Sequence, residues 1–492
     1  MKKILITVCL LMATAVAIAT PVDEMKNNTI AQYKIMVISD IHLLAPALHD
    51  DGQAAVALDS GDMKLVLESD LVMEKMAHVI ESEKPSLLLI TGDLTLNGAR
   101  ASHKRLVEHL KQLKLKGVKT LVIPGNHDVL CPYSRSYLGD KAQPVATVTA
   151  QEFATLYQDY GYGSGSERDP SSLSYVCEPL PGLVVLGIDS NRYSENRSVT
   201  WNDSVTVYNN GGIVKGSTLE WIAGSEILRQ ARASGKKVIA MMHHHLVEHI
   251  DGEAKMLPNY IVSNNEQVCQ QLQQVGVRAV FTGHLHITDA ATWGGTITDV
   301  ATGSASAYPL PLRTATISQR LDTMTISTRF LDKDIDNSIL QKSLSKINNS
   351  APALAAIASR RLWARMGKQM GAIKEMLASQ GVDLSHFPQD EHDLQELILR
   401  HMQQPLSQSL LAITCGDEQP QQASSIIDAI RKGLQSMVAE VIPEQVDTVG
   451  EFLVESLMPR VEPLLRSALE DINQLGSPQE SRTPDLSLKI AL

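Results

Sequence analysis

The chain has 492 residues, of which 43% are hydrophobic and 20% charged, so it can hold more than one folded unit and is too apolar to be largely disordered. Aromatic residues make up only 4%, which argues against surfaces that stack single-stranded nucleic acid or glycans. The net charge of −11 argues against a nucleic-acid polymer or anionic membrane held by bulk electrostatics, so an anionic substrate needs a local positive site.

Residues 1–19 have the pattern of a signal peptide. Lys2 and Lys3 precede an apolar run over 4–17, and residues 17–19 (Ala-Ile-Ala) form a small-x-small cleavage pattern. The run is shorter than the ~20 residues that a spanning helix needs, and no later stretch is long and apolar enough, so we expect no stable membrane span. We therefore expect cleavage and export to a periplasmic or secreted location.

Short apolar runs bounded by polar or glycine-containing turns predict buried strands up to residue 330. They alternate with segments of helical spacing at 71–83 and 102–115, which favours an α/β architecture of layered sheets with flanking helices. Residues 323–327 alternate with period two, which is typical of an antiparallel strand. The predicted buried strands are 34–38, 87–90, 120–123, 183–186, 237–241 and 279–281.

The sequence changes character after residue 332. Apolar residues recur at helical spacing over 362–377 and 427–441, and 452–475 is also expected to be helical. The last residues are polar and contain proline, which is typical of a mobile tail. We therefore expect a signal peptide (1–19), an α/β domain (33–332), an α-helical C-terminal domain (333–475) and a mobile tail (476–492).

The cysteines do not indicate a metal or redox motif. Cys9 lies in the expected signal peptide, and the remaining Cys131, Cys177, Cys269 and Cys415 show no CxxC spacing. An oxidising compartment would permit a disulfide, and Cys131 with Cys177 is the pair to test first. The alternative, that all four are isolated thiols, stays open.

Short motifs rich in metal-ligating side chains each follow a predicted strand. Singly each is weak evidence, because a lone histidine at a strand end is more often a hydrogen-bonded structural residue. Together they bring aspartate, asparagine and histidine to the carboxyl ends of strands, where open α/β sheets bind their ligands. This mixed nitrogen and oxygen donor set predicts a two-metal site. The motifs are SDIH (39–42), TGDL (91–94), PGNHD (124–128), MHHH (242–245) and TGHLH (282–286).

The order DxH, GD, GNH followed by an acid, then H and GHxH resembles the pattern of the calcineurin-like metallophosphoesterases. That family includes purple acid phosphatases and class III cyclic-nucleotide phosphodiesterases. The resemblance runs from Asp40 to His286 and does not cover the helical C-terminal part. It implies a four-layer αββα double β-sandwich, to which this chain adds an α-helical C-terminal domain.

Carried over residue by residue, the resemblance also implies a ligand set of two metal ions. Because three histidines are consecutive, His244 would replace His243 if its strand ran one residue longer. His245 and His249 match no family position and are expected at the surface or behind the ligands. The metals would be divalent or trivalent ions of manganese, iron or zinc. One ion would be held by Asp40, His42 and His286 and the other by Asn126, His243 and His284, with Asp93 bridging them.

The chemistry implied by the resemblance is phosphate-ester hydrolysis. Two divalent ions against Asp40, Asp93 and a bridging hydroxide leave about one positive charge, which can hold a phosphate despite the acidic surface. His127 would donate to a phosphoryl oxygen or protonate the leaving group, and Asp128 would orient it or cap the turn. The expected activity is hydrolysis of phosphate mono- or diesters of small molecules, with nucleotides and cyclic nucleotides among the candidate substrates, by attack of the metal-bridging hydroxide.

Alternatives remain from other classes. The C-terminal helices could mediate assembly or self-association, with the α/β domain as a scaffold, although every motif position is filled. A protein phosphatase is disfavoured because an exported enzyme meets few phosphoproteins. The sequence does not separate monoester from diester substrates. Arg135, in the loop after the third motif, could clamp a second phosphate or an anionic leaving group.

Overall fold

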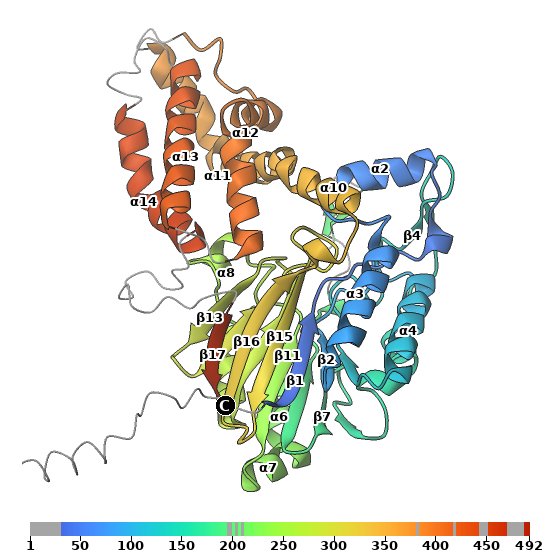
Figure 1. Cartoon of the computed structure of the whole chain (residues 1–492). Helices are drawn as coiled ribbons and strands as arrows, with labels where there is room; N and C mark the ends of the chain where they lie inside the picture. The colour runs from blue at the N-terminus through green and yellow to red at the C-terminus, as the bar shows by residue number, and fades with distance from the viewer. Residues whose placement is uncertain are drawn as a thin grey trace, which may run out of the picture.

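Two β-sheets form the centre of the molecule (Figure 1). The computed structural model describes residues 31–193, 199–201, 205–207, 211–379, 383–416, 420–441, 451–469 and 487–492, so the expected signal peptide lies outside the described residues. The first sheet has the order β17 (Ser487–Ala491), β16 (Thr323–Phe330), β15 (Pro311–Ser318), β1 (Ala31–Ile38), β2 (Leu87–Ile90) and β3 (Thr120–Val122). The second has the order β13 (Asp289–Trp293), β14 (Ile297–Ala301), β12 (Val277–Thr282), β11 (Lys237–Met242), β8 (Leu183–Ile188), β7 (Tyr175–Leu180) and β6 (Ser166–Arg168).

The two sheets share one apolar core. Strands such as β2 and β8 are buried along their whole length, because their runs of leucine, isoleucine and valine face apolar neighbours on both sides. The Tyr175 hydroxyl of β7 donates to the carbonyl of Val122 in β3 at 3.0 Å, which ties the second sheet to the first. Every predicted buried strand is present.

Helices cover the outer faces of the sheets. Met73, Met76 and Ile80 lie on one face of α3 (Ser69–Glu83) and are buried in the core shared by the sheets. Beside it lies α4 (Arg100–Leu115), whereas α7 (Glu226–Ala233) packs on β11 and α9 (Asn265–Gln274) on β12. The expected αββα layering and both predicted helices are confirmed.

Shorter elements complete this half of the chain. They are η2 (Pro46–Leu48), α2 (Gln53–Gly61), β4 (Arg135–Ser136), β5 (Gln143–Pro144), α5 (Ala150–Leu156), η3 (Gln158–Tyr160), β9 (Val199–Trp201), β10 (Val205–Val207), α6 (Gly216–Gly224), α8 (Glu253–Met256) and η5 (Leu331–Lys333).

The C-terminal region is helical, as expected. In Figure 1 its helices stand above the sheets, with α10 beside α2. They enclose a second apolar core that includes Ile398, Met402 and Ile427, and α12 contacts the other four helices. None of the helices in the described part of the chain has the length and hydropathy of a membrane span. The helices are α10 (Asn337–Asn348), α11 (Ala351–Ser379), α12 (Glu391–Cys415), α13 (Pro420–Val441) and α14 (Glu451–Leu469).

The expectation of a mobile tail over 476–492 is wrong for its last residues, which form a strand. Residues 487–491 form β17, which pairs antiparallel with β16. Leu488 and Ile490 alternate with exposed neighbours and are buried, so this edge strand covers apolar surface that β16 would otherwise expose. The run Leu-Lys-Ile is too short for its period to distinguish a strand from a polar tail.

No disulfide joins Cys131, Cys177, Cys269 or Cys415 in the described part of the chain, so the Cys131–Cys177 disulfide is absent. Cys131 instead points its Sγ toward Oδ1 of Asn97, at 3.8 Å. Burial raises the pKa of Cys131, Cys177 and Cys269 to about 12, which keeps them protonated and unreactive near neutral pH.

The buried edge strand predicts a stability difference between neighbouring residues. Replacement of Ile490 by Ala removes buried apolar contacts and should lower the free energy of unfolding by about 2 kcal/mol. Replacement of the exposed Lys489 by Ala is the matched control and should change it by less than about 0.5 kcal/mol. Urea unfolding followed by circular dichroism measures both. Equal effects would show that β17 does not pack on the sheet in solution.

Candidate metal centre

The five motifs meet at one edge of the two sheets. β1, β2 and β3 run parallel in the first sheet, and β8, β11, β12 and β14 run parallel in the second. Five of these strands, β1, β2, β3, β11 and β12, end within two residues of the start of a motif, so their carboxyl ends bring the polar side chains to one place.

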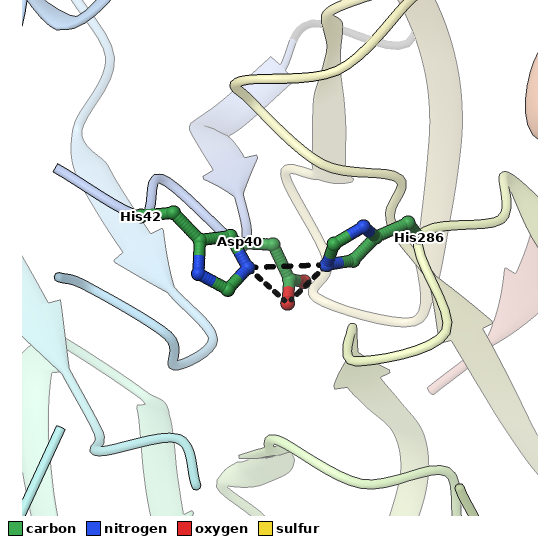
Figure 2. A group of neighbouring side chains, drawn as sticks. All are labelled: Asp40, His42 and His286. Atoms are coloured by element: carbon green, nitrogen blue, oxygen red, sulfur yellow. Dashed lines mark hydrogen bonds and ion pairs between the residues drawn. The ribbon is translucent and has the colours of Figure 1, made fainter. Parts of the chain in front are cut away.

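Asp40, His42 and His286 form the first cluster of possible ligands (Figure 2). Nε2 of His286 lies 3.2 Å from Oδ1 of Asp40 and 3.1 Å from Nε2 of His42, while Nε2 of His42 lies 3.7 Å from the same carboxylate oxygen. Asp40 and His42 are buried, and the His286 side chain is 23% exposed. Two imidazoles and a carboxylate therefore point at one small volume.

Asp93, Asn126, His243 and His284 form a second cluster beside the first. Nε2 of His243 lies 3.3 Å from Oδ2 of Asp93 and 3.1 Å from Oδ1 of Asn126. His284 offers a ring nitrogen to the same group. The same Oδ2 of Asp93 lies 3.6 Å from Nε2 of His42. Asp93 therefore stands between the two clusters, where a bridging ligand is needed.

Backbone carbonyls select the ring nitrogens that face the cluster. Nδ1 of His243 donates to the carbonyl of Thr91 at 3.0 Å, and Nε2 of His284 donates to that of Asn259 at 3.0 Å. A carbonyl can only accept a hydrogen bond, so each of these nitrogens carries the proton. Nε2 of His243 and Nδ1 of His284 are therefore the ring nitrogens available to a metal ion.

The charges of most of the cluster fit metal ligands, which must be unprotonated. The exception is His243: burial alone would lower its pKa, but the nearby Asp93 raises it to about 9, so a metal ion bound there would displace a proton. Burial by itself would raise the pKa of Asp40 and Asp93, but the neighbouring His286 and His243 hold both pKa values below their usual range. Burial lowers the pKa of His42 and His284 well below the usual range. Oδ1 of Asp40 is buried, and the groups that face it are the ring nitrogens of His286 and His42, at 3.2 and 3.7 Å, as expected for an oxygen that shares a cation with them.

The turns that carry the ligands are strained. Asp40, His42, Asp93, His284 and His286 have φ values of 52°, 46°, 47°, 71° and 62°, in the left-handed region that residues with a Cβ atom rarely adopt. Such conformations persist only where the surrounding structure enforces them, and they concentrate at functional sites. The strand ends are bent so that these side chains point inward.

Glycines in the motifs permit close approach. A Cβ on Gly92, whose φ is 100°, would lie 2.5 Å from Nδ1 of His243. A Cβ on Gly125 would collide with the backbone amide and carboxylate of Asp93. Both positions therefore require glycine if the two sheets are to bring their ligands together.

His243, rather than His244, faces the cluster. β11 ends at Met242, and successive side chains then point in different directions. Nδ1 of the buried His244 lies 2.8 Å from Oγ of Ser190, and its ring packs 4.4 Å from that of His284. His244 therefore packs against the candidate ligand His284 and does not face the cluster itself.

The expectation that Asp128 orients His127 is wrong. The Asp128 carboxylate accepts bonds from the amides of Leu94, Thr95 and Gly125 at 2.8–3.0 Å, so it ties the second motif to the third. Burial and the nearby Asp93 raise the pKa of Asp128 to about 7. Asp128 therefore has the turn-capping role that the sequence left open.

Asn97 is the residue that orients His127. Its Oδ1 lies 2.7 Å from Nδ1 of His127, while Nε2 of His127 lies 3.9 Å from Oδ2 of Asp93. Because an amide oxygen only accepts, Nδ1 carries the proton and Nε2 faces the cluster. Sequence reasoning missed Asn97, although the Asn-Gly pair four residues after Asp93 signals a tight turn there.

His245 and His249 are buried rather than at the surface. Nδ1 of His245 lies 2.8 Å from Oε1 of Glu253, and Nδ1 of His249 lies 2.6 Å from Oδ2 of Asp289. Nε2 of His249 also lies 3.3 Å from Oδ2 of Asp299. We call these five residues the buried charge network.

The buried charge network supports both histidine motifs. Oδ2 of Asp299 accepts from the amide of Leu246 at 2.7 Å, and its Oδ1 accepts from the Thr282 hydroxyl at 2.6 Å. Those bonds fix the chain three residues after His243 and two residues before His284. The acidic partners come from separate segments, so no sequence spacing identifies them.

Arg135 does not reach the cluster. Its guanidinium turns back on its own loop and donates to the carbonyls of Pro132 and Ser134 at 3.0 and 2.9 Å. Nη1 of Arg135 is therefore engaged within its own loop, and the phosphate clamp that the sequence left open is not formed here.

A model of the calcineurin-like phosphoesterase family matches residues 33–288. A probable glycerophosphodiester phosphodiesterase GpdQ of Arcobacter nitrofigilis is 25% identical over 235 residues, which is 47% of this chain and 67% of that protein. A probable cyclic nucleotide phosphodiesterase of Vesicomyosocius okutanii is 30% identical over 96 residues, 20% of this chain and 34% of that protein, so the chain spans about a third of its length. The solved structure of a dimetal phosphatase from Danio rerio aligns with 62% of this chain and 98% of its own, with 14% identity and a TM-score of 0.41.

The buried charge network predicts a pH-dependent stability. Burial alone would lower the pKa of His249, but the carboxylates of Asp299 and Asp289 raise it from 6.5 to about 10. A pKa raised on folding stabilises the protein fully below pH 6.5, and this contribution is lost as the pH rises toward 10. Replacement of His249 by Gln should cost about 3 kcal/mol at pH 6 and much less at pH 10.

Urea unfolding at both pH values measures this effect. Replacement of His78 by Gln is the control, because that side chain is 69% exposed and should show little change at either pH. A loss at His249 that is the same at pH 6 and pH 10 would contradict a charged imidazole in the network.

Proposed function

Because the chain belongs to the calcineurin-like phosphoesterase family, we propose that it is a dinuclear-metal hydrolase of phosphate mono- or diesters of small molecules. One observation carries the proposal: Oδ2 of Asp93 lies 3.3 Å from His243 in one cluster and 3.6 Å from His42 in the other. A single carboxylate oxygen placed between two sets of nitrogen and oxygen donors is the arrangement that a pair of metal ions needs.

The proposed ligands follow from the two clusters. Asp40, His42 and His286 would hold one ion, and Asn126, His243 and His284 would hold the other. Asp93 would bridge them. The mixture of imidazole, carboxylate and amide donors suits manganese, iron or zinc ions.

The residues around the clusters perform the remaining steps. When bound, the metal ions would neutralise phosphate charge and lower the pKa of a coordinated water. Nε2 of His127 faces the same volume from a side chain that is 29% exposed, so it can reach both solvent and substrate. In its protonated form His127 would hydrogen-bond a phosphoryl oxygen or give a proton to the leaving oxygen. Asn97 holds the ring in that orientation.

The names of the two relatives, both probable phosphodiesterases, support a diester of glycerol or a cyclic nucleotide as the first substrates to try. Export is a further part of the proposal, supported by the basic, apolar and small-residue pattern of residues 1–19. Amino-terminal sequencing of the mature protein tests it, and an intact Met1 would contradict it.

Removal of the bridging carboxylate should abolish turnover. We expect the manganese-loaded protein to hydrolyse bis(p-nitrophenyl) phosphate, p-nitrophenyl phosphate or both, and to lose this activity in EDTA. Replacement of Asp93 by Ala should lower kcat by at least about 100-fold and lower the metal content, because neither ion keeps its shared ligand. Absorbance assays and elemental analysis of the same samples measure both. Asp159→Ala, in an exposed ion pair, is the control; full activity of Asp93→Ala would overturn the proposal.

Replacement of Asn97 by Asp should shift the pH profile. Burial lowers the pKa of His127, which limits its protonated fraction at neutral pH. A carboxylate in place of the Asn97 amide would favour the imidazolium and raise that pKa, so the alkaline limb of kcat against pH should move upward by about one unit. Asn97→Ala should lower kcat by about tenfold without that shift. Identical profiles for the two variants would show that Asn97 has only a structural role.

A further inference from the structure

We propose that Lys64 binds a second negative charge on the substrate and that helix α10 of the C-terminal region holds Lys64 beside the metal centre. This inference rests on the proposed function and extends it to the substrate class. The second charge could lie on the reacting phosphate, as in a monoester dianion, or on an adjacent phosphate.

A short chain of hydrogen bonds connects the Lys64 segment to the first metal cluster. The amide of Leu65 donates to the carbonyl of Ser306 at 2.7 Å. The hydroxyls of Ser306 and Ser304 in turn donate to the carbonyl of Asp40, at 3.3 and 2.8 Å. Lys64 is therefore next to a residue, Leu65, whose backbone binds the same loop that binds the carbonyl of Asp40.

The charges of this segment act on the site. The Lys64 ammonium lies close enough to His42 and His127 for its positive charge to act on both imidazoles. Burial would raise the pKa of Asp62, which instead is lowered, by Lys64 first and also by His286. A fixed positive charge thus stands on the side of the site where His42 and His127 lie.

The Lys64 ammonium has one ion-pair partner and can donate further hydrogen bonds. Its side chain is only 15% exposed, and its Nζ lies 2.9 Å from Oδ1 of Asp62, its one carboxylate partner within ion-pair distance among the described residues. An ammonium group has three donors, so a single carboxylate leaves others for a substrate oxygen. A largely buried ammonium gains more from a second anion than an exposed lysine would.

Helix α10 fixes both ends of the segment that carries Lys64. Nζ of Lys346 donates to the carbonyls of Asp59 and Asp62, the latter at 3.0 Å. Nζ of Lys342 lies 2.8 Å from Oδ2 of Asp59 and 2.6 Å from Oε1 of Glu68. Figure 1 shows α10 beside α2, at the point where the C-terminal helices meet the catalytic half. The C-terminal region therefore contributes to the substrate site through two lysines.

The substrate preference of a Lys64→Gln variant tests the proposal. Loss of the ammonium should raise KM about tenfold for p-nitrophenyl phosphate, a dianion, and for ADP, but less than about twofold for the monoanion bis(p-nitrophenyl) phosphate. Lys64→Arg keeps the charge and should recover most of the affinity. A larger effect on ADP than on p-nitrophenyl phosphate would place the second charge on the adjacent phosphate. Equal KM changes for all three substrates, or none, would overturn the proposal.

Calorimetry with inorganic phosphate tests the anion site without requiring that the protein turn over a substrate. Calorimetry on the manganese-loaded protein should show a dissociation constant about tenfold higher for Lys64→Gln than for the wild type, with Lys104→Gln, an exposed position, as the matched control. An inactive wild type that still shows this difference would refute the proposed hydrolysis and retain the anion site. Unchanged phosphate affinity in an active enzyme would refute the anion site alone.

The contribution of α10 has its own test. The double variant Lys342→Gln/Lys346→Gln keeps Lys64 but removes the contacts that hold its segment. We expect a selective rise in KM for p-nitrophenyl phosphate with little change in kcat, because the metal ligands are untouched. Circular dichroism checks that the variant is folded. A folded double variant with wild-type KM values for both aryl substrates would show that α10 does not position Lys64.

Discussion

The site depends on one buried carboxylate, that of Asp93, among the histidines of two sheets. Oδ2 of Asp93 approaches His42 and His243, and its Oδ1 accepts the amide of His127 at 2.9 Å. A carboxylate so deeply buried is costly unless positive groups surround it. The imidazoles that meet this requirement come from both sheets, so the same interaction that satisfies Asp93 also joins the two halves of the site.

The residues around the site keep the ligands of the two sheets in fixed positions. Ligands in left-handed turns stay there because carbonyls, glycines and carboxylates behind them leave no room to relax. Asp128 ties the second motif to the third, and Asp299 ties the chain after His243 to the chain before His284. Buried aspartates thus have two separate roles. Some face the candidate metal ions, and others hydrogen-bond two motifs to each other.

The C-terminal helices have their own apolar core, yet they are not independent of the catalytic half. Lys342 and Lys346 of α10 bind the segment over 59–68, and the Ser467 hydroxyl of α14 accepts a bond from the amide of Asp251 at 2.7 Å. Both contacts join the C-terminal helices to segments of the α/β half. The sequence alone predicts a separate C-terminal domain, but these bonds attach it to the α/β half at two places.

The sequence by itself determined the strands, their layering and the seven candidate ligands, because each signal is local: an apolar run predicts a buried strand, and the polar motif after it lies at the strand's carboxyl end. Tertiary structure alone decided which groups surround those ligands. Asn97 replaces Asp128 as the partner of His127, His249 pairs with Asp289 and Asp299, and the segment that carries Lys64 is held by α10. These partners are far apart in the chain, and only the packing of the two sheets and the helices sets the distances between them.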